Sequence, residues 1–183
     1  MNLIFRTLLH LATSRRRSPL GMHDLGTVRF RVLPTDLDIL GHMNNGVYFS
    51  IMDLGRVDLM IRAGAWSRLR AAGIYPVMAS ETMTFRKSLQ PWQLFDLETR
   101  LVGYDEKGSV FTEQRFVVDG EIYASAMTRA RFLKKGGGTV SLQQLAEVMG
   151  LDAASFNPPE WVARWAADVA LPSTRAEAPS TWS

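Results

Sequence analysis

The chain has 183 residues, of which 46% are hydrophobic, 21 are basic, 18 are acidic and none is cysteine. This length fits one domain with short additions, and the hydrophobic fraction is too high for a disordered chain. The absence of cysteine excludes a disulfide framework, a zinc–thiolate site, an iron–sulfur cluster and a thiol nucleophile.

The positive charge is concentrated at the start of the chain. Residues 1–23 contain four arginines and no acidic residue, so the other 160 residues carry 17 basic and 18 acidic side chains. The body of the protein is therefore near neutral and has no evident stripe of basic and aromatic residues. We expect no nucleic-acid partner.

The first segment predicts a short helix before a triple arginine. Its apolar stretch is interrupted by Arg6 and His10 and is shorter than the roughly 20 residues that span a bilayer. A secretory signal would place its charge before the apolar run, whereas here the basic cluster follows it. The helically spaced apolar residues are Leu3, Ile4, Leu8, Leu9, Leu11 and Ala12.

Three interpretations of this segment remain open: a helix packed on the domain, a membrane-surface anchor formed by residues 1–17, or an organelle presequence in a eukaryotic source. The first is favoured because short amphipathic termini usually dock on their own domain. We expect a cytoplasmic location, at a membrane surface if the segment is an anchor, or in an organelle matrix if it is a presequence.

A strand is predicted over residues 27–33, where β-branched and aromatic residues alternate until Pro34. Residues 35–46 are rich in Asp, Asn and Gly and predict a loop. A helix follows from Val47 to about Ala63 and is apolar almost all round, which predicts that other structure surrounds it.

Gly64 is expected to end this helix, and residues 66–72 predict a further turn or two. The pattern then changes to long segments rich in Val, Phe, Tyr, Thr and Met, and Asp119-Gly120 is a strong hairpin signal. We expect a four-strand antiparallel meander and an α+β fold in which one curved sheet surrounds one long helix. The four segments are residues 75–88, 93–104, 109–118 and 121–133.

The C-terminal part predicts two short helices, residues 142–149 capped by Ser141 and residues 160–170 opened by a Pro-Pro pair. The tail from Pro172 is rich in Ser, Thr, Pro and Ala. We divide the chain into an N-terminal basic amphipathic segment (1–23), a central domain (24–138) and a C-terminal helical extension with a tail (139–183).

Residues 36–46, DLDILGHMNNG, form the densest cluster of chemically capable side chains, directly before the long helix. A helix start offers free N–H groups and the positive end of a dipole, so a carboxylate beside it can act on a carbonyl that those groups polarise. Asp and Asn before a helix are also common caps, and Asn-Gly is a common turn. Spacing alone favours the cap and leaves both interpretations open.

The stretch TDLDILGHMNNGVYFSIMDLGRVD, with the strand before it, resembles the hot-dog fold acyl-CoA thioesterases related to 4-hydroxybenzoyl-CoA thioesterase. Their signature is Asp-x-Asp-x-x-Gly-His-x-Asn-Asn running into an aromatic-rich helix. The resemblance continues through TFRKSLQPWQLFDLETRLVGYDEKG to about Leu133, and is nearest to members with an extra N-terminal helix and a C-terminal helical extension. It implies a hot-dog fold and hydrolysis of an acyl-CoA to free acid and CoA, with no metal or cofactor.

Carried over by position, the catalytic carboxylate of the family falls on Asp38. The N–H that polarises the thioester carbonyl would come from the helix start, near Asn45 and Gly46. Asp38 would either attack the carbonyl or activate a water molecule, and the sequence does not choose between these routes.

Other positions of the motif have less defined roles. Asp36 matches an aspartate that looks structural, and His42 is either an orienting hydrogen-bond partner or, by preference, a residue that holds the loop. Asn44 either fixes the loop or contacts the acyl group, and Tyr48 is a further substrate-binding candidate. Asp53 is a second carboxylate on the helix, for which pairing with an arginine of the same helix is the default.

CoA phosphates need cations, and we take Arg86 and Lys87 as candidate substrate-binding residues, with Arg129 and Arg131 as further cations. Solvated surface charge is the more common role for such residues. In the resembled family, two subunits join their sheets and each site lies at the shared interface, which implies a homodimer or a tetramer. The residues suggested for an acyl tunnel, each equally explained as core, are Phe49, Met52, Val77 and Met83.

A second hypothesis is a hot-dog module without catalytic activity that binds an acyl chain or a partner, at a membrane if residues 1–17 anchor it. A hydratase-type hot-dog protein is less favoured because the long helix has no histidine where that chemistry would use one.

Overall fold

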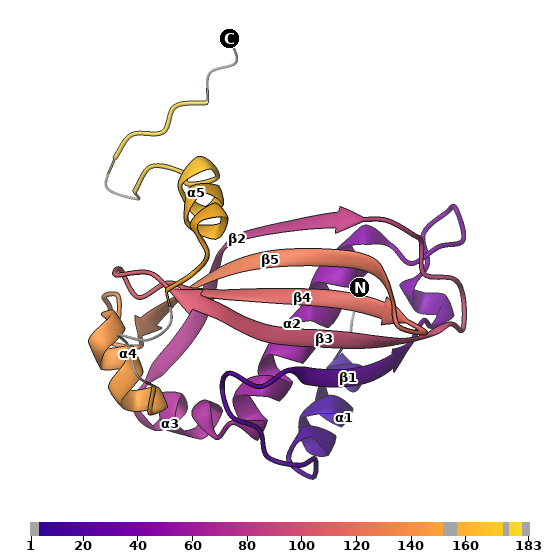
Figure 1. Cartoon of the computed structure of the whole chain (residues 1–183), viewed down its shortest axis with the longest axis horizontal. Helices are drawn as coiled ribbons and strands as arrows, with labels where there is room; N and C mark the ends of the chain where they lie inside the picture. The colour runs from indigo at the N-terminus through magenta and orange to yellow at the C-terminus, as the bar shows by residue number, and fades with distance from the viewer. Residues whose placement is uncertain (1–3, 152–156, 174–175, 181–183) are drawn as a thin grey trace.

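The structure is a computed structural model that describes residues 4–151, 157–173 and 176–180 (Figure 1). The elements in chain order are α1 (Ile4–Ser14), β1 (Gly26–Arg31), the 3-10 helix η1 (Pro34–Asp36), α2 (Asn45–Arg62), α3 (Ala65–Ala71), β2 (Ile74–Phe85), β3 (Leu94–Tyr104), β4 (Val110–Val118), β5 (Glu121–Lys134), α4 (Leu142–Met149) and α5 (Glu160–Asp168). Each predicted helix and strand is present. The first strand ends before Pro34 because the chain turns there into η1, and the last helix ends at Asp168 rather than at residue 170.

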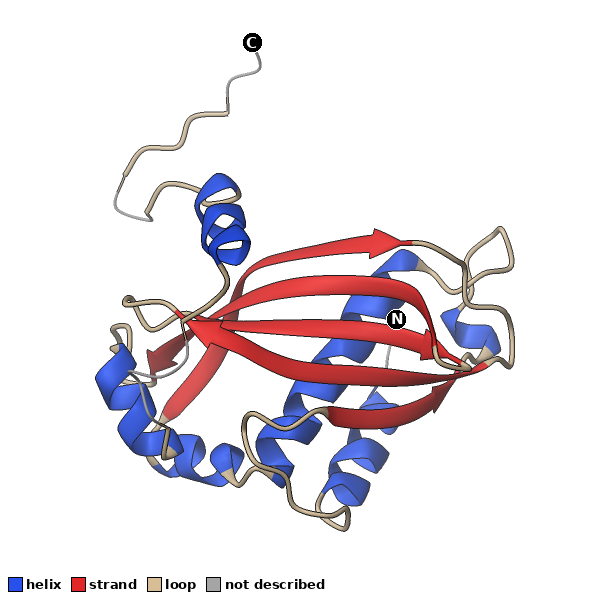
Figure 2. Ribbon diagram, viewed as in Figure 1, coloured by secondary structure: helices blue, strands red, loops and turns tan. Residues whose placement is uncertain are grey.

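All five strands form one antiparallel sheet in the order β1-β3-β4-β5-β2. The expectation of a four-strand meander is correct for β3, β4 and β5 and wrong for β2, which pairs with β5 instead of β3. The helices α2 and α3 stand between β1 and β2, so the chain crosses the sheet before it enters β2 (Figure 2). This crossover leaves β2 at one edge of the sheet and β1 at the other.

The long helix α2 packs against one face of the sheet. Alternate residues of each strand point to the same face, and on β4 these include Gln114 and Phe116, which are fully buried. The approach is closest at Gly55, where a Cβ atom would lie 2.5 Å from Leu97 Cδ2 and 2.7 Å from Thr99 Oγ1. Only glycine lets α2 sit this near β3. The core under the first half of α2 contains Val47, Tyr48, Ile51, Met52, Phe95, Leu97, Phe116 and Ala126.

The two terminal helices lie on different parts of this core. α1 packs on α2, which is the first of the three interpretations of the N-terminal segment, and Leu3 lies outside the described residues. α5 packs on the opposite face of the sheet, where Phe111 of β4 and Met127 of β5 contact Val162 and Ala166. Figures 1 and 2 show the resulting arrangement, a curved sheet against one long helix, which is the hot-dog fold.

Candidate active site

The loop between η1 and α2 is a narrow hairpin. Leu37 and Met43 form an isolated β-bridge across it. Inside that bridge the Asp38 N–H donates to the His42 carbonyl oxygen (2.8 Å), and outside it the Asn44 N–H donates to the Asp36 carbonyl oxygen (2.8 Å). The backbone therefore fixes Asp38 relative to Asn44, the residue that precedes α2.

The Asp38 carboxylate is half-buried and caps its own turn. Its Oδ1 accepts the Leu40 N–H at 2.9 Å and the His42 N–H at 3.4 Å. Its Oδ2 accepts no hydrogen bond from the residues that the structure describes. One oxygen thus orients the side chain, and the other remains available for chemistry.

The start of α2 is capped by Asn44 and not by an aspartate. The Asn44 Oδ1 accepts the Gly46 N–H (2.9 Å), and the Asn44 carbonyl oxygen accepts the Val47 N–H (2.9 Å). The Asn45 N–H donates to no acceptor among the described residues. The sequence pointed to Asn45 and Gly46 together, and the structure separates them: Gly46 satisfies the cap, while Asn45 presents a free N–H at the positive end of α2.

Asp36 is fully buried and ties the two ends of the loop together. Its Oδ2 accepts the Leu33 N–H at 2.9 Å and a hydrogen bond from Arg6 Nη1 at 2.8 Å, while its Oδ1 is buried without a hydrogen bond. The structural role that the resemblance suggested for Asp36 agrees with this geometry. Its partner Arg6 lies 30 positions away and was not connected with the loop by the sequence.

His42 and Tyr48 lie at different depths. The His42 ring is partly exposed and forms none of the hydrogen bonds found among the described residues. Tyr48 is buried in the core, where its hydroxyl accepts the Leu89 N–H (3.2 Å) and its ring contacts Phe85 and Phe116 edge-on. Burial raises the pKa of Tyr48 above its usual value, and the Leu89 hydrogen bond opposes this shift.

The two cations expected at a CoA site lie just after β2. Arg86 Nη1 and Lys87 Nζ both bind Glu121, at 2.7 and 2.6 Å. Two residues further on, the Leu89 carbonyl oxygen accepts the Met43 N–H (3.1 Å). The sheet therefore brings these cations to the same end of the molecule as the Asp38 loop.

Arg129 and Arg131 belong to another region. Arg129 is buried, and its guanidinium binds Ser109 Oγ, the Ala166 carbonyl oxygen and Asp105 Oδ2 at 3.0–3.2 Å. It therefore joins β5 to α5, on the face of the sheet away from α2. Arg131 is exposed near the same surface.

A cavity of about 130 Å³ lies between the second half of α2 and the sheet. Its walls are mainly apolar and include Leu59, Met60, Met78 and Phe132. None of the four residues suggested for an acyl tunnel lines it: Met52 is buried core, Phe49 and Met83 pack against the core, and Val77 is 40% exposed on the edge strand.

Asp53 and Arg56 stand at one side of this cavity. As expected for a carboxylate on this helix, Asp53 pairs with an arginine of the same helix, Arg56. Arg56 also lies 3.0 Å from Glu81 and donates to Gln114 Oε1 at 2.7 Å. Burial raises the pKa of Glu81, and the Arg56 guanidinium partly offsets this shift.

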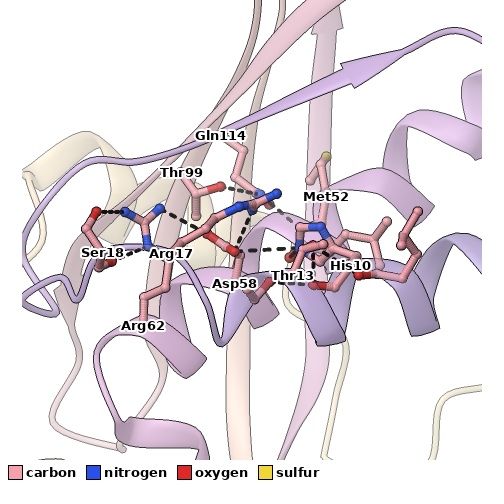
Figure 3. Close-up of polar contacts among 12 residues, drawn as sticks. His10, Thr13, Arg17, Ser18, Met52, Asp58, Arg62, Thr99 and Gln114 are labelled. Carbon is pink, nitrogen blue, oxygen red and sulfur yellow. Dashed lines mark hydrogen bonds and ion pairs between the residues drawn. The ribbon is translucent and has the colours of Figure 1, made fainter.

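Asp58 is fully buried, like Asp36, and it holds the N-terminal segment on α2 (Figure 3). Its oxygens accept hydrogen bonds from Arg17 (2.8 Å) and Arg62 (3.2 Å), and His10 Nε2 lies 3.9 Å away. His10 Nε2 also lies 2.9 Å from the Leu54 carbonyl oxygen. The sequence reasoning missed this cluster; the signal that could have found it is Asp58 within a largely apolar helix, because a buried carboxylate requires a cation.

Two features are absent from the part of the chain that the structure describes. Among residues 4–151, 157–173 and 176–180, no group of three or more His, Asp or Glu side chains is arranged to hold a metal ion. No described helix has the length and apolar character needed to cross a membrane.

The chain is similar in sequence to known proteins. The model of the thioesterase-like superfamily matches residues 32–166. Protein THEM6 of Xenopus laevis is 39% identical over 100 residues, which cover 55% of this chain and 48% of that protein. A probable thioesterase of Saccharomyces cerevisiae, YBR096W, is 27% identical over 120 residues, which cover 64% of this chain and 52% of that protein. The chain thus spans about half the length of these curated relatives.

Solved structures show the same fold. The probable thioesterase YbaW of Escherichia coli has a TM-score of 0.63 and 20% identity, over 67% of this chain and 95% of that one. The DHNA-CoA thioesterase of Staphylococcus aureus has a TM-score of 0.59 and 14% identity, over 79% of this chain and 90% of that one. The family match, residues 32–166, contains the loop before α2, α2, α3, the strands β2 to β5 and α4, and it begins after α1 and β1.

Proposed function

This chain belongs to the thioesterase-like superfamily, and on that premise we propose that it hydrolyses an acyl-CoA to a free acid and CoA. The observation that carries the proposal is the arrangement at the start of α2. The Asp38 carboxylate is fixed in the loop before the helix, and the Asn45 N–H at the helix start has no partner among the described residues.

The chemistry requires only these groups. A thioester is weakly stabilised by resonance and its thiolate is a good leaving group. The Asn45 N–H and the α2 dipole would stabilise the carbonyl oxygen as it gains negative charge. Asp38 would then act in one of two ways: its Oδ2 attacks the carbonyl carbon, the thiolate leaves and water hydrolyses the resulting anhydride, or it takes a proton from a water molecule that attacks directly.

The test is release of CoA from a panel of short, long and aromatic acyl-CoAs, followed with a thiol reagent. Wild type and the control Asp168→Asn, an exposed carboxylate on α5, should be equally active, while Asp38→Asn should be inactive. No release of CoA from any substrate, or equal release by Asp38→Asn, would show that the proposal is wrong. In a single turnover in ¹⁸O-water, a heavier Asp38 peptide would identify the anhydride route, because ¹⁸O enters this side chain only when water attacks the Asp38 carbonyl carbon of an anhydride.

We also propose that the substrate's phosphates contact Arg86 and Lys87. These two exposed cations share one carboxylate, Glu121, so the three side chains together carry one net positive charge. Replacing both with alanine should raise KM for acyl-CoA several-fold and leave KM unchanged for an acyl-pantetheine, which lacks the nucleotide. An equal change for both substrates would contradict this contact.

We propose that two copies of the chain pair through β2. Its outer edge has no strand partner among the described residues, and Tyr75, Val77 and Phe85 on this strand are 40–43% exposed. Free edges with exposed apolar residues favour pairing with another strand. Sedimentation should give a dimer or a dimer-based tetramer for wild type and for Val169→Lys, and smaller species for Val77→Lys. Val169, which directly follows α5, is a control of similar exposure. A monomeric wild type would contradict the proposal.

A second candidate activity, contact with an anionic membrane surface, is favoured by one feature of α1. Leu8 and Leu9 are 59% and 68% exposed, and Arg15 and Arg16, also exposed, form no ion pair with the described residues. An exposed apolar face beside cations suits a surface of acidic lipids. The protein should sediment with phosphatidylglycerol vesicles but not with phosphatidylcholine vesicles. Leu8→Gln with Leu9→Gln should abolish this, and Leu171→Gln should not; equal binding by both variants would contradict it.

A further inference from the structure

Two buried carboxylates of the central domain pair with arginines of the N-terminal segment. Arg6 Nη1 lies 2.8 Å from Asp36, and Arg17 Nη1 lies 2.8 Å from Asp58. Both carboxylates are almost completely shielded from water. The two distances are equal, but the two carboxylates have different surroundings in the domain.

Asp58 has a second cation and Asp36 has none. Arg62, on the same helix as Asp58, lies 3.2 Å from it, so Asp58 remains paired without Arg17. Among the described residues, Arg6 is the only ion-pair partner of Asp36. Without Arg6, the Asp36 carboxylate would keep a single hydrogen bond, from the Leu33 N–H, and would be a buried and uncompensated charge.

The backbone of Asp36 connects this charge to the candidate active site. Its carbonyl oxygen accepts the Asn44 N–H, and Asn44 caps α2 just before the free N–H of Asn45. Asp38 follows two residues later and is held in the same hairpin. Any movement of Asp36 toward water would therefore shift Asp38 relative to the start of α2.

Arg6 is itself held in place on the domain. Its second guanidinium nitrogen, Nη2, donates to the Arg31 carbonyl oxygen at the end of β1, and its guanidinium carbon lies 5.4 Å from the centre of the Phe30 ring. The side chain thus bridges α1, the end of β1 and the loop. α1 lies before residues 32–166, the stretch that matches the superfamily.

From these contacts we propose that Arg6 is a positioning residue for the reaction: by neutralising buried Asp36, it holds the loop that carries Asp38 against the start of α2. The inference rests on the proposed thioesterase function for its kinetic consequence, but the effect on the loop can be measured without any substrate.

The kinetic test compares Arg6→Gln with Arg17→Gln, two arginines of the same segment that each bind a buried carboxylate at 2.8 Å. Arg6→Gln should lower kcat by about 100-fold, the typical cost of misplacing a catalytic group by about 1 Å, and should leave KM within about twofold. Arg17→Gln should leave both constants near wild type. Arg6→Lys should recover part of the lost kcat, because it restores the charge beside Asp36 but not the forked contact with the Arg31 carbonyl oxygen.

The structural test is hydrogen exchange of the backbone amides at Leu33, His42 and Asn44, followed by mass spectrometry of the full chain. Exchange should be faster in Arg6→Gln and unchanged in Arg17→Gln. If wild type hydrolyses no acyl-CoA, the proposed function fails while this comparison still reports on the link between Arg6 and the loop.

Three results would overturn the inference. Equal effects of Arg6→Gln and Arg17→Gln would mean that the segment only stabilises the domain. A raised KM with unchanged kcat in Arg6→Gln would mean that Arg6 contacts the substrate. If Arg6→Gln does not fold, the double variant with Asp36→Asn should fold and protect the loop, because it removes both charges; its failure to do so would also contradict the inference.

Discussion

The two terminal helices of this protein are attached to the central domain by different forces. α1 and the arginines that follow it are held on α2 and the loop by polar contacts of Arg6, His10 and Arg17 with groups of the domain. α5 is held on the outer face of the sheet by an apolar cluster centred on Phe111 and Val162. The buried Arg129 of β5 adds one hydrogen bond to the Ala166 carbonyl oxygen of α5. The difference indicates separate roles: α5 covers hydrophobic surface, whereas α1 supplies charges that buried carboxylates of the domain require.

The largest expected effect tests the α5 side of this comparison. Phe111 is 1% exposed and packs against α5, so Phe111→Ala should lower the free energy of unfolding by about 3–5 kcal/mol. Its kcat, measured well below the unfolding temperature, should remain near wild type because this face of the sheet is separate from the Asp38 loop. Urea denaturation measures the free energy of unfolding, and steady-state kinetics measures kcat. A large loss of kcat in the folded variant would place α5 in the active site.

A smaller effect is expected on the α1 side at Arg17. Arg17→Gln should lower the free energy of unfolding by less than about 1 kcal/mol, because Arg17 is partly exposed and Arg62 still neutralises Asp58. Urea denaturation of this variant beside wild type measures the change. A loss as large as that of Phe111→Ala would mean that Arg62 cannot replace Arg17.

The smallest effect concerns the pH dependence of α1 docking. Burial lowers the pKa of His10 below its usual value, while the Asp58 carboxylate and the Leu54 hydrogen bond oppose this shift and Arg17 and Arg6 add to it. The unfolded chain therefore binds a proton more readily than the folded one, so stability should fall as the pH drops below about 6.5. Wild type should lose more thermal stability between pH 7.5 and 5.5 than His10→Gln, which keeps a donor toward the Leu54 carbonyl oxygen. An equal loss in both proteins would exclude His10 as the titrating group.

The local parts of the fold could be predicted from the sequence because their signals are local. Asp119-Gly120 marks the turn between β4 and β5, and a long run of residues that is apolar almost all round marks α2. The pairing of β2 with β5 could not be predicted in this way, because it depends on a crossover through α2 and α3 that brings distant segments together. A meander is the simplest order for consecutive strands, and the crossover breaks it.

The same distinction holds for the candidate site. The Asp38 loop and the start of α2 are contiguous in sequence, so the motif located them. Asn45 and Gly46 have different roles because only one of their backbone N–H groups donates a hydrogen bond to the Asn44 side chain. The geometry of that side chain decides which one. The Arg6–Asp36 pair joins residues 30 positions apart, and the apolar spacing around Arg6 predicted only the helix that carries it.

The measurement that tests the account most directly is made on Asp38→Asn, with binding and turnover measured on the same preparation. The amide oxygen can still accept the Leu40 N–H, so the loop should keep its shape. We expect acyl-CoA to bind as tightly as to wild type, and the single-turnover rate of CoA release to fall by about 1,000-fold or more. Release of CoA at the wild-type rate by this variant would show that Asp38 does not carry the reaction.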